Sequence, residues 1–153
     1  MLLKISTILN TKEFNNEFNE IFKFIKDVIQ IYPNSQQWYE VKVKEGLFDG
    51  TREIFYLKEN DNIIAICICK KDSIQYKICT LYVKEEFRNQ GYATLLLENA
   101  FHYLNTTKPI ISIPLKVVPY FEWIIKNNNW ELTSSNNNNN FIELLYNEKE
   151  LNI

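Results

Sequence analysis

The chain has 153 residues, of which 46% are hydrophobic and 14% aromatic, and its formal net charge is −2. This length and composition suit one domain with a sizeable core, so we expect residues 1–153 to form a single domain. The slightly negative charge argues against nucleic acid as a partner by bulk electrostatics, and no apolar run is long enough to span a membrane.

The first third of the chain predicts one strand and two helices. β-Branched and leucine residues predict a strand over residues 2–9. Apolar residues then recur with helical spacing over residues 14–32, and Pro33 ends this amphipathic helix. Asn34 or Ser35 begins a second helix, which we expect to end near Gly46.

The middle of the chain predicts a hairpin and a third strand. Asp49-Gly50 predicts a turn. Strands over residues 53–57 and 63–69 flank a polar turn and should pair as a hairpin. A further strand is expected over residues 75–83.

The last elements alternate between helix and strand. In order, the sequence predicts a helix over residues 90–104, a strand over 109–113 buried on both faces, a helix over 119–126, a strand over 130–133, a solvated turn over 134–140 and a final strand over 141–146. The complete order is β-α-α-β-β-β-α-β-α-β-β.

The cysteines and the start of the chain indicate in which cellular compartment the protein is found. Cys67, Cys69 and Cys79 are odd in number and lie in strand-like segments. Cys67 and Cys69 share one strand face, a spacing that suits neither a redox pair nor a metal site. Lys4 and Ser6 interrupt the apolar start of the chain, which argues against a signal peptide. We therefore expect reduced core thiols, no metal and a cytoplasmic protein.

The stretch around which the chain is organised runs from Ile78 to Leu97. An apolar strand ends at Val83, and Arg88-x-x-Gly91-x-Ala93 then leads into a leucine-rich helix. A glycine turn before a helix with unpaired N–H groups can hold a phosphate or pyrophosphate. The six residues by themselves are equally compatible with a simple chain break and a solvated Arg88. No G-x-G-x-x-G or G-K-[ST] motif is present to support another phosphate-binding fold.

Residues 81–93 resemble the acetyl-CoA-binding motif of the GNAT superfamily of N-acetyltransferases, in which a strand ending in Val is followed by R-x-x-G-x-G/A. Residues 32–54 further resemble a subset of small, single-domain bacterial GNAT proteins. The predicted element order also matches this family. The resemblance implies an α/β (α+β) fold with a mixed, mostly antiparallel sheet of about seven strands flanked by about four helices.

The resemblance implies an enzyme that moves an acetyl group from acetyl-CoA directly to a primary amine. The acceptor is unidentified: a small molecule, a peptide N-terminus, a lysine or a charged tRNA. The oligomeric state is also open, a homodimer being one option. Leu81 and Val83 would offer backbone groups to the pantetheine arm. Arg88 would stand beside the pyrophosphate as a cation or stay mostly in water. The loop that would wrap the pyrophosphate comprises Arg88, Asn89, Gln90, Gly91, Tyr92, Ala93 and Thr94.

The sequence departs from the family pattern where the general acid is expected. Many members carry Tyr-x-x-x-Gly-Phe, but Ile125 stands at the tyrosine position. Tyr120 is the nearest phenol and a candidate acid, or simply an amphipathic residue at a helix start. Glu53 could reach the amine, directly or through water, or be a cross-strand surface partner. The missing tyrosine supports an alternative, a catalytically impaired acyl-CoA-binding or regulatory module. An interaction domain without CoA affinity is a further alternative.

Overall fold

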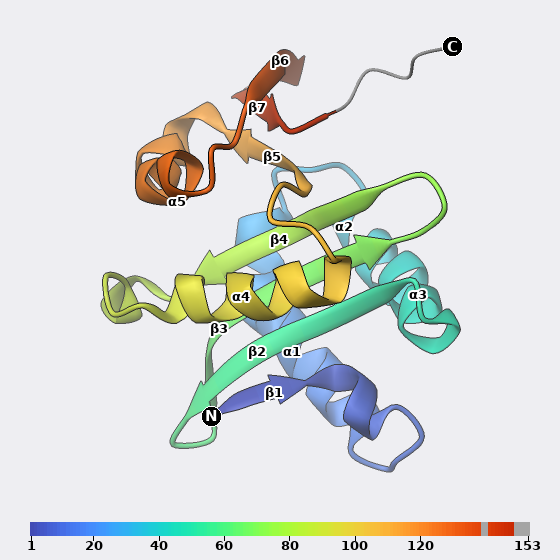
Figure 1. Ribbon diagram of the computed structural model, residues 1–153. Coiled ribbons are helices and arrows are strands. Elements are labelled where there is room, and N and C mark those ends of the chain that lie inside the picture. Colours follow the sequence, from blue (N-terminus) through green and yellow to red (C-terminus); the bar gives the residue numbers. More distant parts are fainter. Residues whose placement is uncertain (139–140, 149–153) are drawn as a thin grey trace.

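The computed structural model describes residues 1–138 and 141–148, and within them seven strands form one sheet in the order β1-β2-β3-β4-β5-β7-β6 (Figure 1). The strands are β1 (Leu2–Lys4), β2 (Arg52–Glu59), β3 (Asn62–Lys71), β4 (Tyr76–Val83), β5 (Ile110–Pro114), β6 (Leu132–Asn138) and β7 (Phe141–Tyr146). β4 and β5 pair in parallel, and the other neighbours pair antiparallel. The predicted mixed, mostly antiparallel sheet is confirmed.

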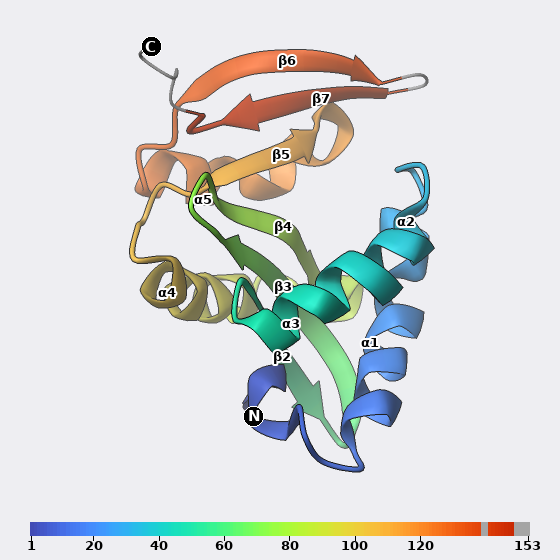
Figure 2. The same cartoon turned by 90° about the vertical axis from the view of Figure 1, so that its right-hand side faces the viewer.

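Helices cover both faces of this sheet, with α4 on one side and α1 and α3 on the other (Figure 2). The helical segments are η1 (Ile5–Ile8), α1 (Phe14–Ile29), α2 (Ser35–Gln37), η2 (Trp38–Val43), α3 (Lys44–Asp49), η3 (Glu85–Phe87), α4 (Tyr92–Leu104), η4 (Leu115–Phe121) and α5 (Glu122–Asn127). The backbone stays helical at the junctions of α2, η2 and α3, which therefore form one run. We refer to the two sides of the sheet as the α1 face and the α4 face.

Each face of the sheet has its own apolar cluster. On the α1 face, buried residues of α1 recur every three or four positions, as helical periodicity requires, and pack against Ile54, Tyr56 and Ile66 of the sheet. On the α4 face, Leu96, Ala100 and Leu104 cover the alternate residues of the same strands. The sheet is thus buried on both sides over β2 and β3, which explains why both strands are almost continuously apolar.

The turns that the sequence predicts are present, and their turn residues adopt the expected backbone conformations. Asn60 and Asp61 both adopt positive φ, at 52° and 65°, which is the backbone of a tight two-residue hairpin. Gly50 follows α3 with φ 84° and closes the helix in the left-handed conformation. Asp49 accepts two hydrogen bonds from Thr51, which lower the pKa of its carboxyl.

The prediction of a strand over residues 2–9 is wrong beyond Lys4. The ladder pairs Leu2 with Leu57 and Lys4 with Phe55, so a longer strand would have placed Ser6 opposite Glu53. Instead the Ser6 N–H donates to Oε1 of Glu53 at 3.1 Å, and the chain turns into η1. A side-chain acceptor has replaced the backbone acceptor, and Ile5 is buried under the α1 face.

The predicted solvated turn over residues 134–140 is also wrong for residues 134–138. Residues 132–138 form the edge strand β6, which pairs with β7. Its Ser and Asn side chains through residue 137 are exposed, as an edge strand permits. The ladder forms because β7 supplies backbone partners, a source of stability that side-chain composition does not reveal. Residues 139 and 140 lie outside the described residues.

Three smaller expectations also change. The second predicted helix continues past Gly46 to Asp49. β5 is buried on one face only, because Ile111 and Ile113 enter the α4-face cluster while Ser112 is half-exposed on the other side. The helix predicted over 119–126 begins instead as the 3₁₀ segment η4.

Candidate active site

β4 and β5 splay apart after a short parallel pairing. The ladder joins Lys77 to Ile110 and Ile78 to Ile111, and beyond these residues the two strands diverge (Figure 2). We call the region between the ends of β4 and β5 the splay. A parallel pair that separates in this way leaves backbone groups of both strands without a ladder partner along the splay.

The backbone of β4 is directed into the splay at two positions. The N–H of Lys84 donates to the carbonyl of Ile64 on β3 at 2.8 Å. Because neighbouring residues of a strand direct their backbone groups to opposite sides, those of Leu81 and Val83 point away from β3 and toward β5. Their side chains pack into the α4-face cluster. The two residues that the resemblance assigns to a pantetheine arm are therefore suitably oriented for it.

The loop after β4 leads directly into the N-terminus of α4. Gly91 precedes the helix with φ 85° and ψ 5°, and, its two chain neighbours apart, no residue has an atom within 4 Å of the place where a Cβ would stand. The first intrahelical bond runs from Leu95 N to Gly91 O at 3.0 Å, so the N–H groups of Tyr92, Ala93 and Thr94 precede it. These donors and the positive end of the helix dipole suit an anion.

Arg88 lies across the splay. Its Nε donates to the carbonyl of Val83 at 2.9 Å. Its Cζ lies 5.6 Å from the ring centroid of Tyr82 on β4 and 5.1 Å from that of Tyr120 on η4. Both distances allow cation–π attraction. Arg88 is half-buried, and its Nε occupies one of the carbonyls that faces the splay.

The two catalytic candidates differ in position. Tyr120 is 68% exposed and lies on η4, beside the splay, with its ring against Arg88. Glu53 lies on β2, which β3 separates from β4. It is buried, and its Oε1 accepts the N–H groups of Ser6 and Ile54 at 3.1 and 3.0 Å. The interpretation of Glu53 as a surface partner is wrong, and the structure does not bring it to the splay.

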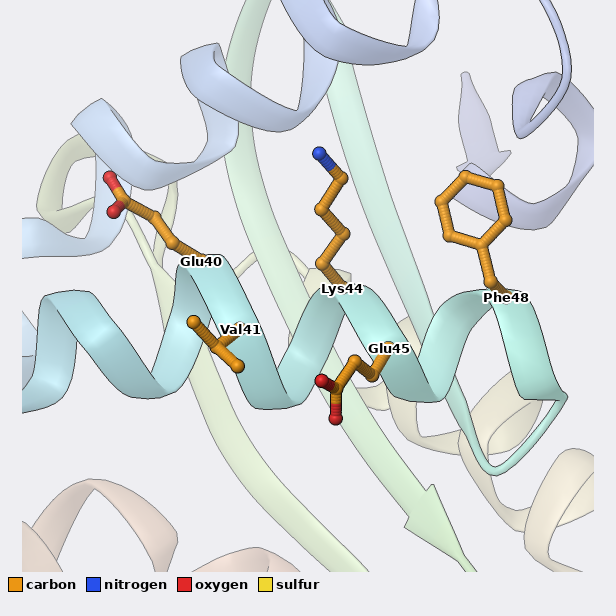
Figure 3. A pocket seen from close by; sticks show the side chains of 5 residues that line it. All are labelled: Glu40, Val41, Lys44, Glu45 and Phe48. Atoms are coloured by element: carbon orange, nitrogen blue, oxygen red, sulfur yellow. The ribbon is translucent and has the colours of Figure 1, made fainter.

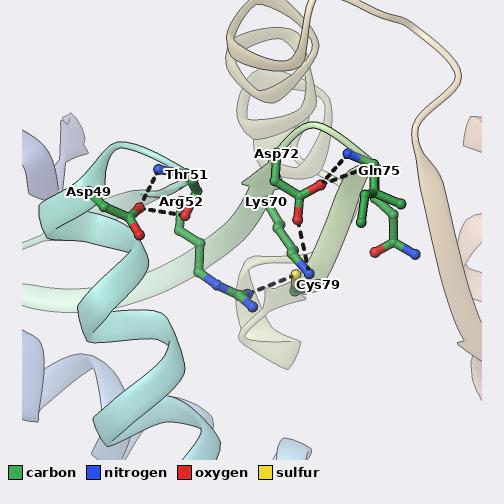
Figure 4. Close-up of polar contacts among 8 residues, drawn as sticks. Asp49, Thr51, Arg52, Lys70, Asp72, Gln75 and Cys79 are labelled. Atoms are coloured by element: carbon green, nitrogen blue, oxygen red, sulfur yellow. Dashed lines mark hydrogen bonds and ion pairs between the residues drawn. The ribbon is translucent and has the colours of Figure 1, made fainter.

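A cluster around Arg52 lies on the α1 face of the sheet. The β3–β4 register skips Cys79, which forms a bulge in β4. Arg52 donates from Nη1 to Sγ of Cys79 at 3.4 Å (Figure 4), and its Cζ lies 5.6 Å from the Trp38 ring centroid. Burial raises the pKa of the Cys79 thiol, although the nearby Arg52 acts in the opposite direction. Cys67, Cys69 and Cys79 are free thiols, as predicted.

A contact between Tyr32 and Glu143 could not be predicted from the sequence. Tyr32, in the segment after α1, donates a hydrogen bond to Oε2 of Glu143 on β7, 111 positions away. Burial and this carboxylate raise the pKa of the Tyr32 phenol far above its usual value. No spacing rule links residues so far apart, and the strand order that brings β7 beside β5 creates the contact.

A shallow hollow lies elsewhere, on the outer surface of the η2–α3 run. It is lined by Glu40, Val41, Lys44, Glu45 and Phe48 (Figure 3). It contains none of the residues of the splay. Within residues 1–138 and 141–148, no cluster of His, Cys, Asp or Glu side chains could hold a metal ion. No helix in that part of the chain is long and apolar enough to cross a membrane.

A family model covers most of the elements that build this site. Residues 12–112 match the model described as the acetyltransferase (GNAT) family, which is more than half of the chain. The match includes β4, the loop after it and α4. No curated protein matches the sequence.

Solved structures share the fold at low sequence identity. A GNAT-family protein from Desulfovibrio desulfuricans has a TM-score of 0.67 and 10% identity over 95% of this chain and 97% of its own. A GNAT-family acetyltransferase from Bacillus cereus has a TM-score of 0.64 and 18% identity over 99% of both chains. A protein from Bacillus anthracis, named as a streptothricin acetyltransferase and solved with acetyl coenzyme A, has a TM-score of 0.53 and 13% identity over 63% of this chain and 61% of its own.

Proposed function

The chain belongs to the GNAT acetyltransferase family, and we propose that it transfers the acetyl group of acetyl-CoA directly to a primary amine, with residues 1–153 acting as one domain. The observation that carries this proposal is the left-handed Gly91 at the start of α4, in the loop that follows a strand whose backbone faces the splay. In the structural relative from Bacillus anthracis, acetyl coenzyme A is bound to a similar fold.

The residues present suit acetyl-CoA as the acyl donor. The pyrophosphate would accept hydrogen bonds from the N–H groups at the start of α4, with the loop from Arg88 to Thr94 around it. The absence of any atom, those of its two chain neighbours apart, within 4 Å of a Cβ position at Gly91 leaves room for phosphate oxygens. The pantetheine arm would lie in the splay against the backbone of Leu81 and Val83.

Direct transfer needs an oriented amine and two proton movements. The neutral amine attacks the thioester carbon, the C–S bond then breaks, and the acetyl group stays on nitrogen. The amine nitrogen loses a proton and the leaving thiolate gains one. Tyr120 is an exposed phenol beside the splay, and we propose it as the donor to the thiolate.

Tyr120→Phe tests this role, since it keeps the ring that packs on Arg88 and removes the hydroxyl. We expect kcat to fall by about 100-fold, with the KM for acetyl-CoA unchanged. Tyr76→Phe, at an exposed tyrosine on β4, is the matched control. An unchanged kcat would restrict Tyr120 to its contact with Arg88.

A non-catalytic acyl-CoA-binding module of the same fold is the alternative. Two observations favour it: Ile125 stands where many relatives have the acid, and Arg88 occupies the Val83 carbonyl. Both functions predict acetyl-CoA binding, so binding cannot separate them.

The experiment that tests the proposal has two stages. Acetyl-CoA at millimolar concentration should raise the melting temperature by mass action. A panel of primary amines should then release CoA thiol, followed with a thiol reagent. A thermal shift with no thiol release for any amine would favour the binding module. If acetyl-CoA causes no thermal shift, the assignment of the cofactor site is wrong.

A further inference from the structure

β6 is the last strand of the sheet, and within residues 1–138 and 141–148 no strand pairs with its outer edge (Figure 2). Its inner edge pairs with β7 from Leu132 to Asn138. The backbone groups of a strand alternate between its two edges, so every second residue of β6 directs its N–H and C=O away from β7. Such a row of open donors and acceptors is a template on which another strand can pair.

The opposite edge of the sheet is protected against such pairing. β1 is only 3 residues long and ends at the exposed Lys4. The chain then turns into η1, where the Ser6 N–H donates to the carboxylate of Glu53 at 3.1 Å. A short edge strand and a lysine are common devices against edge-to-edge pairing. The β1 edge therefore offers little backbone to a partner.

β6 lacks these devices over most of its length. The strand has 7 residues, and none of them is charged or a proline. Its one bulge lies near the start, where the ladder with β7 skips Thr133, whose hydroxyl donates to the carbonyl of Leu145 at 3.0 Å. From Ser134 to Asn138 the register is unbroken. The side chains of residues 134–137 are exposed, so no described element covers this segment.

The composition of β6 makes this edge complementary to itself. A two-fold axis through the middle of residues 134–138 pairs β6 antiparallel with the β6 of a second copy, and each Ser or Asn then meets another Ser or Asn. No like charges oppose each other, and hydroxyl and amide groups can form hydrogen bonds across the two strands. Glu131, which precedes the strand, lies at opposite ends of the pair in the two copies. The net charge of −2 adds little repulsion between them.

We propose that the outer edge of β6 is an interface between two copies of this chain, which pair antiparallel over residues 134–138 and join their sheets into one. The interface uses neither the splay nor the loop from Arg88 to Thr94, so this inference is independent of the proposed function. Backbone hydrogen bonds supply most of the attraction. Because the contact is small, we expect a reversible dimer with a dissociation constant in the micromolar range.

Sedimentation equilibrium of the full chain tests the dimer. As the protein concentration rises from about 1 μM to about 1 mM, the average mass should increase from the 18.3 kDa of one chain toward twice that value. Amide hydrogen exchange over the same concentrations locates the interface. Exchange in residues 134–138 should become slower as the concentration rises, whereas exchange in residues 2–4 of β1 should not change.

Charged variants of the edge give a sharper test. Ser135 and Asn137 are exposed and lie on the same face of β6. Ser135→Lys with Asn137→Lys should raise the dissociation constant at least about tenfold through like-charge repulsion, and so should Ser135→Glu with Asn137→Glu. A mixture of these two variants should form a mixed dimer at least as tight as that of the parent, because opposite charges then meet.

The matched control adds the same charge elsewhere. Asn15→Lys with Asn19→Lys changes two exposed residues of α1, on another part of the surface, and should dimerise as the parent does. Loss of the dimer in this control would mean that net charge, and not the β6 edge, decides association, which would overturn the proposal.

The remaining outcomes also decide the proposal. A single-chain mass at about 1 mM would overturn it. A dimer in which exchange of residues 134–138 does not depend on concentration, charged variants that dimerise as the parent does, or folded variants that fail to pair when mixed would each overturn it as well. If the charged variants do not fold, the mass and the exchange of the parent protein still decide.

Discussion

The loop that we assign to acetyl-CoA and the contact between Tyr32 and Glu143 are built in opposite ways. The loop from Arg88 to Thr94 is contiguous in sequence, and its geometry follows from one glycine and one helix start. Tyr32 and Glu143 are 111 positions apart and meet through the order of the strands. A contiguous site tolerates changes elsewhere in the fold, whereas an assembled site depends on how distant elements pack.

Two glycines show the same difference between local geometry and packing of distant elements. Gly91 has φ 85° and, its two chain neighbours apart, no atom within 4 Å of a Cβ, so its requirement is backbone conformation and space for a ligand. A Cβ at Gly46 would lie 2.5 Å from Cγ of Arg52, so its requirement is close packing against the stem that carries the guanidinium to Cys79. Gly91 is thus needed for a local site, and Gly46 is needed for the packing between α3 and β2.

The largest expected effect is at the contiguous site. Gly91→Glu places a side chain and a negative charge at the pyrophosphate donors, and we expect acetyl-CoA affinity to fall by at least about 100-fold. The fold should survive with a loss of about 1–2 kcal/mol, since no packed atom is displaced. Calorimetry with acetyl-CoA and a thermal melt measure both effects.

Gly50→Glu is the matched control for that variant. Gly50 has φ 84° and equally open surroundings, but it ends α3 away from the loop. It should show the same loss of stability with acetyl-CoA affinity intact. If Gly91→Glu binds acetyl-CoA as the parent does, the cofactor site is elsewhere and the proposed function falls with it.

Gly46→Ala disturbs the assembled face instead. The new methyl group clashes with the Arg52 stem, so either the helix or the strand must shift, and we expect a loss of about 1–3 kcal/mol in the free energy of unfolding. Acetyl-CoA affinity should stay within about threefold of the parent, because β4 and α4 are not displaced. Urea unfolding and calorimetry check this prediction. A large loss of affinity at normal stability would show that the two regions are coupled.

Arg88→Ala changes a side chain that connects the loop to β4 and η4, and its effect should be smaller. The change removes the bond to the Val83 carbonyl and the contacts with Tyr82 and Tyr120, but the backbone donors of α4 remain. We expect acetyl-CoA affinity to change by less than about tenfold, clearly less than for Gly91→Glu. Arg88→Lys, which keeps charge but not the planar group, distinguishes the two contributions. An effect as large as that of Gly91→Glu would contradict the partial role given to this side chain.

The smallest effect at neutral pH concerns two cysteine thiols of the sheet, Cys69 and Cys79, and the half-buried Tyr103 of α4. A hydrogen bond with Cys67 and burial raise the pKa of Cys69, burial raises that of Cys79, and burial raises the pKa of Tyr103 to about 12. The folded protein therefore keeps protons that the unfolded chain loses above ordinary pKa values of 9.0 and 10.0. These groups stabilise the fold fully below about pH 9, and the free energy of unfolding should fall as pH rises toward 12. Urea unfolding at several pH values checks this, and a flat profile would contradict it.

The sequence by itself determined the elements whose stability is local. Helical spacing in α1 and α4, the Asn60–Asp61 turn and the glycine loop each depend on residues close in the chain, so periodicity and turn chemistry identify them. The strand, loop and helix around Gly91 also supported the family resemblance, which the family model bears out.

Tertiary structure decided the features that depend on distant partners. β6 is a strand because β7 pairs with it, and β1 ends early because the Glu53 carboxylate accepts the Ser6 N–H. The position of Arg88 across the splay and the meeting of Tyr32 with Glu143 have the same origin. Backbone pairing and long-range side-chain contacts gain their free energy from the whole sheet, and no short segment carries that information.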